Sequence, residues 1–177
     1  EVLLRLINLS DAKENEETIF IWPESIIPNN NLRSLRENFN YLFKKSFSEK
    51  HTIILGINDE EIENDKLKFF NTLSILDYEA NTLYKYNKNK LVPFGEFLPL
   101  ENILSAMGLK SLTNNYQSYS SSNIRDPFSL NKYEKFKILP LICYEIIYSG
   151  ELSKNSDEYN FIVNISEDGW FGDSIGP

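Results

Sequence analysis

The stretch FKILPLICYE, residues 136–145, predicts a buried β-strand that ends at the chain's single cysteine, Cys143. Its apolar residues follow one another with little of the polar alternation seen in a strand that has one face in water. Such a short, almost continuous apolar run is typical of a strand that lies in a protein core. We therefore expect a buried strand at residues 136–142.

The rest of the chain alternates between two kinds of apolar spacing. The periodicity predicts further strands at residues 18–22, 51–57, 69–78, 82–86 and 161–165. It predicts helices at residues 1–10, 31–49 and 100–112, and polar connections at residues 59–66 and 113–132. The helix at 100–112 is apolar on one face, so we expect it either to pack on the core or to act as a lid. Helices that interleave with strands indicate an α/β or α+β fold.

Composition and charge exclude several classes of protein. The 177 residues carry a net charge of -8 at pH 7, and 41% of them are hydrophobic. We expect one globular domain over residues 1–177, because no internal repeat or linker divides the chain. The acidic charge disfavours nucleic-acid binding, since phosphate contacts require a basic surface. No apolar run reaches the roughly 18 residues of a membrane span. The ends, at Glu1 and Pro177, are those expected of a fragment of a longer protein.

Three predicted strands are followed closely by reactive side chains, namely Glu24, Lys88 and Cys143. Ligands of open α/β sheets usually bind at this edge, beyond the carboxyl ends of the strands. There a thiol can attack a carbonyl, a carboxylate can take its proton, and an ammonium can stabilise the oxyanion. Taken singly, each residue is more often a solvated charge or a buried core thiol. The assignment therefore depends on the motifs around them.

These motifs resemble those of the nitrilase superfamily. In order along the chain they are Trp22-Pro23-Glu24-Ser25, Tyr86-Asn87-Lys88-Asn89-Lys90-Leu91-Val92-Pro93-Phe94-Gly95-Glu96 and Ile142-Cys143-Tyr144-Glu145. Residues 168–177, DGWFGDSIGP, are similar to the apolipoprotein N-acyltransferase branch of that superfamily. The resemblance begins near residue 18, and Glu167 stands where that branch usually has asparagine. It implies a nitrilase-like α-β-β-α sandwich of α/β (α+β) class, incomplete at both ends in this chain.

The resemblance implies a catalytic role for three of the motif residues. Glu24 would be the general base, Lys88 would hold the oxyanion, and Cys143 would form a thioester with the acyl group. We expect Lys88 to favour the thiolate of Cys143, because a nearby cation lowers the pKa of a thiol. A thioester suits acyl transfer because it remains reactive toward an amine.

Supporting roles are implied for five further residues. Glu96 would be an essential carboxylate near the lysine, and Glu145 follows the cysteine as it does in the family. The backbone amide of Tyr144 is a candidate second donor to the oxyanion. Trp170 and Phe171 are candidate substrate contacts, although such aromatic residues are also common core anchors.

The implied reaction moves an acyl chain from a phospholipid to the N-terminal amine of diacylglyceryl-cysteine in a bacterial apolipoprotein. It implies an enzyme of the bacterial inner membrane, held there by segments outside this chain, with its catalytic domain facing the periplasm. We expect no cofactor, and no metal, since His51 lacks neighbours at metal-ligand spacing. Two alternatives stay open: a soluble amidase that uses the same triad to hydrolyse a small amide, and an inactive nitrilase-like binding domain.

Overall fold

The computed structural model describes residues 1–99, 118–130, 136–148, 150 and 159–167. Its helices are α1 (Val2–Ser10), α2 (Leu32–Ser46) and the short 3-10 helix η1 (Cys143–Ile147). One sheet, in the order β1-β2-β3-β4, is formed by β1 (Thr18–Ile21), β2 (His51–Glu63), β3 (Lys66–Leu76) and β4 (Thr82–Asn87). A second sheet, in the order β5-β6-β7, is formed by β5 (Phe128–Ser129), β6 (Lys137–Ile142) and β7 (Phe161–Ile165). The predicted α/β class is confirmed.

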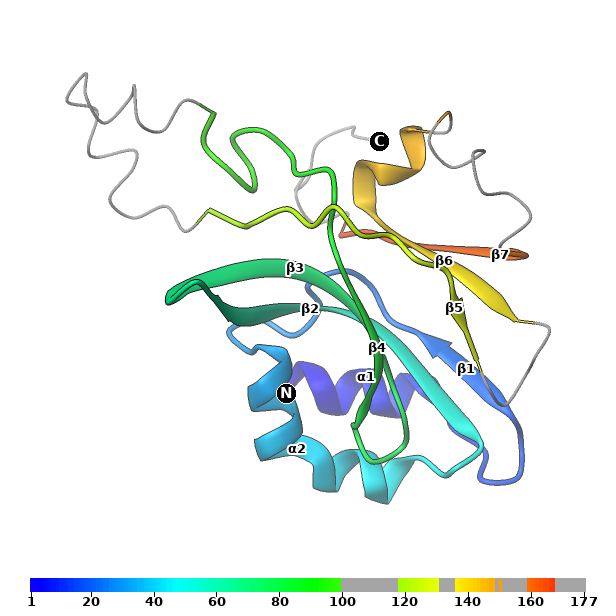
Figure 1. Ribbon diagram of the computed structural model, residues 1–177. Coiled ribbons are helices and arrows are strands. Elements are labelled where there is room, and N and C mark those ends of the chain that lie inside the picture. Colours follow the sequence, from blue (N-terminus) through cyan, green and yellow to red (C-terminus); the bar gives the residue numbers. More distant parts are fainter. Residues whose placement is uncertain (100–117, 131–135, 149, 151–158, 168–177) are drawn as a thin grey trace, which may run out of the picture.

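The elements form layers around two hydrophobic cores. Figure 1 shows α1 and α2 against one face of the four-stranded sheet and the three-stranded sheet across its other face. The core under the helices includes Trp22, Leu35, Phe43, Leu55 and Leu76. The core between the sheets includes Ile54, Leu73, Ile75, Ile138, Ile142 and Ile165. Successive residues of β2 therefore point into different cores, as the alternation of a strand requires. The predicted sandwich of two sheets is confirmed.

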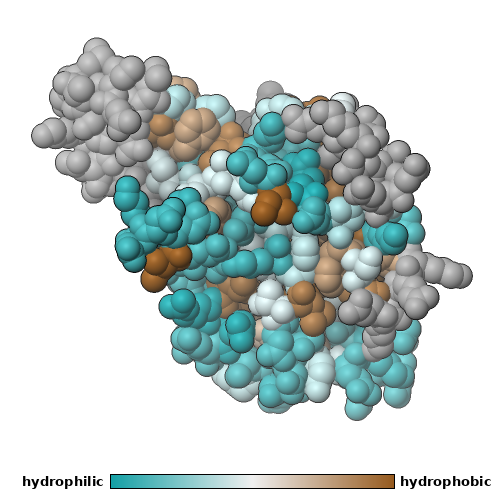
Figure 2. Space-filling view, in the orientation of Figure 1, coloured by the Kyte–Doolittle hydropathy of each residue, from teal (hydrophilic) through white to brown (hydrophobic). Residues whose placement is uncertain are grey.

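Helix α2 follows directly from its sequence. Its first turn is capped in both directions, because Asn31 Oδ1 accepts from the Ser34 amide at 2.8 Å and Ser34 Oγ accepts from the Asn31 amide at 3.0 Å. Leu32, Leu35 and Phe43 are buried along one side of the helix. The surface over α2 is mostly hydrophilic (Figure 2). This amphipathic pattern confirms the helix that the apolar stripe predicts.

The polar connection expected at residues 59–66 is wrong, because β2 and β3 continue through most of it. Only Asn64 and Asp65 form the turn, with φ of 50° and 60°. Two turn residues with positive φ match the right-handed twist of the strands that they join. A charged residue before the turn is paired across the sheet, since Lys85 Nζ of β4 lies 2.7 Å from the Asp59 carboxylate. The charged residues suggested a longer turn, but pairing between β2 and β3 keeps most of them in strands.

Several sequence predictions fall wholly or partly outside the described residues. The helix at 100–112 and the aromatic residues Trp170 and Phe171 lie there. The described part of the connection at 113–132 contains the short strand β5, because Phe128 pairs with Ile138 of β6. Among the described helices, none combines the length and the apolar character needed to cross a bilayer.

Strand direction determines which residues meet at the candidate site. β1 is parallel to β2, and β4 is antiparallel to β3, which is itself antiparallel to β2. β1 and β4 therefore end at the same edge of the first sheet, where Glu24 and Lys88 follow them. Cys143 follows β6, which belongs to the second sheet and runs parallel to β7. The three side chains thus come from two facing sheets and not from one open sheet.

Candidate active site

Lys88 lies at the centre of a buried cluster of charges just beyond β4. Its side chain is 1% exposed, and its Nζ lies 3.0 Å from the Glu96 carboxylate and 3.4 Å from Glu24 Oε1. Burial alone lowers the pKa of Lys88, but the negative charges of Glu24 and Glu96 outweigh that effect and raise it. Lys88 is therefore an ammonium ion held between two carboxylates.

Glu96 reaches this cluster from a tight turn in the motif that follows β4. Its Oε2 accepts a hydrogen bond from the Val92 amide at 2.9 Å, and the Glu96 amide donates to the Val92 carbonyl at 2.8 Å. Phe94, between them, has φ of 63°. The turn thus folds Glu96 back onto Lys88, and the structure places this predicted residue beside the lysine.

Asn71, in the middle of β3, is a residue of the site that the sequence reasoning missed. Its Nδ2 donates to Glu24 Oε1 and to Glu96 Oε1, at 2.7 Å in each case. Its backbone carbonyl accepts from the Lys88 amide at 2.9 Å. Asn71 therefore bridges both carboxylates and fixes the start of the lysine segment. A buried amide within the apolar run of β3 was the signal that could have found it.

Cys143 stands at the junction of β6 and η1 in a left-handed backbone conformation, with φ of 55°. Burial, followed by the negative charge of Glu24, raises the pKa of the Cys143 thiol. A side-chain hydrogen bond with Ser166, the charge of Lys88 and the Tyr144 amide act in the opposite direction. Lys88 thus favours the thiolate as expected, but in the free site burial and Glu24 outweigh its effect on the pKa of Cys143. An attack by Cys143 would therefore need a base to take the thiol proton, and Glu24 is the candidate for it.

Replacing Glu24 with glutamine should therefore lower the pKa of the Cys143 thiol, although it removes the candidate base. The wild-type thiol has a raised pKa, so its alkylation by iodoacetamide should increase with pH through a midpoint above the ordinary thiol value. In Glu24→Gln the repulsive charge is gone, and the midpoint should move to lower pH. Mass spectrometry of the Cys143 peptide across a pH series measures this. An unchanged or higher midpoint would contradict the electrostatic assignment.

The second oxygen of Glu24 is held from the end of β7. The Glu167 amide donates to Glu24 Oε2 at 3.1 Å. Because this contact uses the backbone of Glu167, it does not depend on having asparagine at that position. Glu24 is thus fixed by donors from three different segments, which include Asn71 and Lys88.

Gly56 of β2 is a second residue that the sequence reasoning missed. Its amide donates to the Pro23 carbonyl at 3.1 Å. A Cβ placed on Gly56 would lie 2.4 Å from the Cα of Glu24 and 2.9 Å from Cδ1 of Ile165. Only glycine lets the backbone of Glu24 pass this close to β2.

Gly56→Ala should consequently displace Glu24 and destabilise the protein by about 1–3 kcal/mol, the usual cost of overpacking a core. Activity should fall more than the loss of folded protein explains, because the base is the displaced group. Gly150→Ala is the control, since a Cβ there has nothing within 4 Å. Melting temperature and activity of both variants test this, and a Gly56→Ala protein that matches the control would refute it.

Glu145 and Tyr144, directly after the cysteine, have contrasting environments. The Glu145 side chain is fully buried, and its Oε2 accepts from the Ile142 amide at 2.9 Å. Tyr144 is 47% exposed, and its backbone amide interacts with the Cys143 sulfur. Glu96 and Glu145 are thus both buried, and neither is a solvated surface charge.

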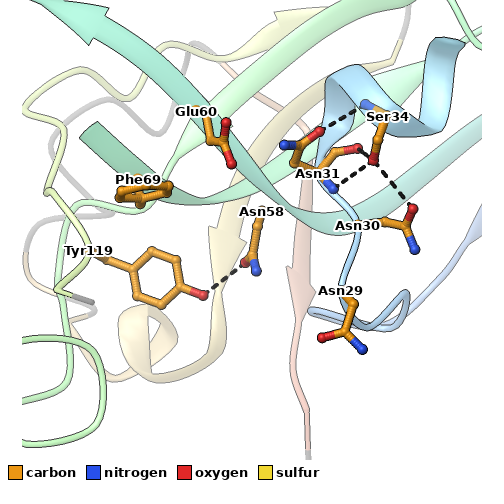
Figure 3. Close-up of a pocket in the computed structure, with 8 residues that line it drawn as sticks. All are labelled: Asn29, Asn30, Asn31, Ser34, Asn58, Glu60, Phe69 and Tyr119. Carbon is orange, nitrogen blue, oxygen red and sulfur yellow. Dashed lines mark hydrogen bonds between the residues drawn. The ribbon is translucent and has the colours of Figure 1, made fainter. Parts of the chain in front are cut away.

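A polar pocket of about 320 Å³ lies between the start of α2 and the strands β2 and β3 (Figure 3). It is lined by Asn29, Asn30, Asn31, Ser34, Asn58, Glu60, Phe69 and Tyr119. Tyr119 donates its hydroxyl to Asn58 Oδ1 at 3.0 Å, and Asn58 is paired with Asn71 in the β2–β3 ladder. The lining can hydrogen-bond a polar group, but among the residues that the structure describes it contains no lysine or arginine for a phosphate.

Comparison with protein families agrees with this arrangement. The model of the carbon-nitrogen hydrolase family matches residues 2–177. The chain belongs to the carbon-nitrogen hydrolase family.

Relatives of this carbon-nitrogen hydrolase chain include proteins named apolipoprotein N-acyltransferase. It is 34% identical over 179 residues to that of Rickettsia typhi, which aligns 99% of this chain with 34% of the relative. It is 36% identical over 172 residues to that of Wigglesworthia glossinidia brevipalpis, which covers 92% of this chain and 32% of the relative. It is 30% identical over 188 residues to that of Bradyrhizobium diazoefficiens, which covers 100% of this chain and 34% of the relative. The chain thus spans about a third of the length of these relatives.

Solved structures with a similar fold are more distant in sequence. A glutamine-dependent NAD+ synthetase from Acinetobacter baumannii has a TM-score of 0.56 at 16% identity, covering 94% of this chain and 28% of that one. A nitrilase-superfamily amidase from Nesterenkonia has a TM-score of 0.54 at 11% identity, and the match covers 94% of this chain and 60% of the amidase. These likenesses confirm the fold expected of a carbon-nitrogen hydrolase.

Proposed function

We propose that this chain is the catalytic part of an apolipoprotein N-acyltransferase. It would move an acyl chain from a phospholipid, through a thioester on Cys143, to the N-terminal amine of a diacylglyceryl-cysteine in an apolipoprotein. The observation that carries the chemistry is the buried contact of Lys88 with Glu24 and Glu96. The charges of Lys88 and Glu24 both affect the pKa of the Cys143 thiol. The relatives named above support this acceptor over the small amide of an amidase, because the amidase likeness rests on 11% identity.

In the first step Cys143 attacks the ester carbonyl of the phospholipid while Glu24 takes the thiol proton. The carbonyl oxygen becomes negative, and the Lys88 ammonium with the Tyr144 amide would stabilise it. The C–O bond to the glycerol then breaks, and the proton on Glu24 passes to the departing lysophospholipid. Because Glu96 and Glu24 raise the pKa of Lys88, the cation persists without giving up its proton.

In the second step the amine of the acceptor attacks the thioester carbonyl. The C–S bond breaks, an amide forms, and Glu24 transfers the proton from the amine to the sulfur. The site returns to its starting state after each cycle, as the two-step exchange of a covalent intermediate requires. Asn71 would hold Glu24 in place through both steps by its hydrogen bond at 2.7 Å.

The same proposal includes a location at the bacterial inner membrane and two further substrate contacts. This chain matches about a third of the length of its relatives. Membrane attachment would come from segments of the full-length protein that correspond to the other two thirds. The catalytic domain would then face the periplasm from the bacterial inner membrane, next to both lipid substrates. Trp170 and Phe171 would contact substrate.

Mass spectrometry of the full-length protein tests the proposal. After incubation with a phospholipid, Cys143 should gain the mass of one acyl chain and release one lysophospholipid. Adding a diacylglyceryl-cysteine peptide should then remove that mass from Cys143 and place it on the peptide amine. A protein that forms no acyl-enzyme from phospholipid, or that passes the acyl group only to water, would refute the transferase assignment and favour an amidase.

A further inference from the structure

Arg125 lies outside the motifs around Glu24, Lys88 and Cys143, yet it is built into the site. Its Nη2 donates to Glu145 Oε1 at 2.9 Å, and its Nε donates to the Tyr86 hydroxyl at 3.1 Å. The guanidinium also lies over the Tyr86 ring, 5.6 Å from its centroid. The side chain is only 11% exposed. A planar guanidinium can make these contacts at the same time, which a lysine cannot.

Glu145, the partner of Arg125, connects the lysine segment (residues 88–90) to the cysteine turn (residues 142–145). Its Oε1 accepts from the amides of Asn89 and Lys90, at 2.9 and 3.1 Å, directly after Lys88. Its Oε2 accepts from the Ile142 amide at 2.9 Å, directly before the cysteine. This one carboxylate therefore links the backbone after Lys88 to the backbone before Cys143.

Tyr86 completes the contacts around this carboxylate. Its hydroxyl donates to Glu145 Oε1 at 2.7 Å. Burial and the charge of Glu145 raise the pKa of Tyr86, so it remains a neutral donor. The acceptor is a fully buried anion, and Arg125 is its ion-pair partner within the described parts of the chain. Removing the cation from such a pair leaves an uncompensated buried charge, which is strongly unfavourable.

The segment that carries Arg125 also runs along the candidate site. The Tyr119 amide donates to the Glu96 carbonyl at 2.8 Å, and the Ser122 amide donates to the Lys88 carbonyl at 3.1 Å. Its backbone thus touches two candidate residues before Arg125 reaches Glu145. Arg125 thus adds an ion pair with Glu145 to a segment whose backbone already contacts Lys88 and Glu96.

We propose that Arg125 is a positioning residue: through Glu145 and Tyr86 it fixes the lysine segment against the cysteine turn. The inference rests on the proposed function for its rate measurements, since Arg125 itself touches neither substrate nor thiol. A small shift of Lys88 relative to the attacked carbonyl is enough to slow the reaction, because misplacement by about 1 Å can cost on the order of 100-fold.

Three variants of the full-length protein test this role. Arg125→Met removes both polar contacts, Arg125→Lys keeps the charge but not the two-pronged geometry, and Arg36→Met alters an exposed arginine of α2 as the control. The rate of acyl-enzyme formation should fall by about 10- to 100-fold in Arg125→Met, with KM for the phospholipid nearly unchanged. Arg125→Lys should recover part of that loss, and the control should match the wild type.

A double variant separates positioning from general stability. If Arg125 acts through Glu145, adding Arg125→Met to Glu145→Gln should change the rate by less than about twofold, because the two losses share one contact. Fully additive losses, or a rate for Arg125→Met that returns to normal at a temperature where the variant is folded, would overturn the inference.

The rate of Cys143 alkylation does not depend on the phospholipid substrate, so it tests the positioning role of Arg125 separately from the proposed function. If the wild type makes no acyl-enzyme from phospholipid, the proposed function fails. Arg125→Met should still alter the alkylation of Cys143 relative to Arg36→Met, since the cysteine turn loses its anchor. Equal alkylation rates in these two variants would overturn the positioning role.

Discussion

Replacing Cys143 with serine should abolish acyl-enzyme formation and leave thermal unfolding nearly unchanged. The substitution exchanges one sulfur for one oxygen and keeps the same Cβ, so the left-handed backbone at φ of 55° is no more strained than before. A hydroxyl is a much weaker acid than a thiol, and the environment of this site already opposes ionisation. We expect turnover to fall by on the order of 1000-fold or more, as when the nucleophile of a triad is removed.

Intact mass after incubation with phospholipid, together with the melting temperature, measures this effect. Cys143→Ala is the matched control, because it removes the nucleophile without adding a hydroxyl. Both variants should be folded and inactive. A serine variant that acylates lipoprotein at close to the wild-type rate would show that another group attacks the ester.

Replacing Lys88 with methionine should impair both catalysis and folding. The lysine is 1% exposed and is the cation of a cluster with Glu24 and Glu96, so its loss leaves two buried carboxylates close together. Breaking a buried ion pair in this way costs about 3–5 kcal/mol of folding free energy. Loss of the oxyanion partner should lower the rate of acylation by on the order of 100- to 1000-fold.

Lys85→Met on the same strand is the control for Lys88→Met. Lys85 pairs with Asp59 and Glu61, but its own side chain is 38% exposed, so water can replace part of these contacts. Its loss should therefore cost less stability than the loss of the fully buried Lys88. Denaturant unfolding and single-turnover acylation of both variants make the comparison. Equal stability losses would contradict the buried cluster, and near-normal acylation by Lys88→Met would contradict its role at the oxyanion.

The sequence predicted the elements well wherever a local pattern controls them. The strand at 161–165 is β7 as predicted, and the helix of α2 follows its apolar stripe. The prediction failed at 59–66, where charged residues resemble a turn but β2 and β3 continue through most of the range. The paired residues there are close in the chain, from Glu63 with Lys66 to Asp59 with Phe70, so β2 and β3 form a hairpin. The charged side chains are stabilised by cross-strand pairing, which polarity alone does not reveal.

The sequence by itself determined the family motifs and hence the candidates Glu24, Lys88 and Cys143. Only the tertiary structure decided that these candidates come from two facing sheets, with Asn71 bridging the two carboxylates beside the lysine. It also decided the direction of the Cys143 pKa, since Lys88 lowers it as expected but burial and Glu24 outweigh that effect and raise it. The physical reason is that desolvation and Coulomb interactions depend on distances through space, which the order of residues along the chain does not contain.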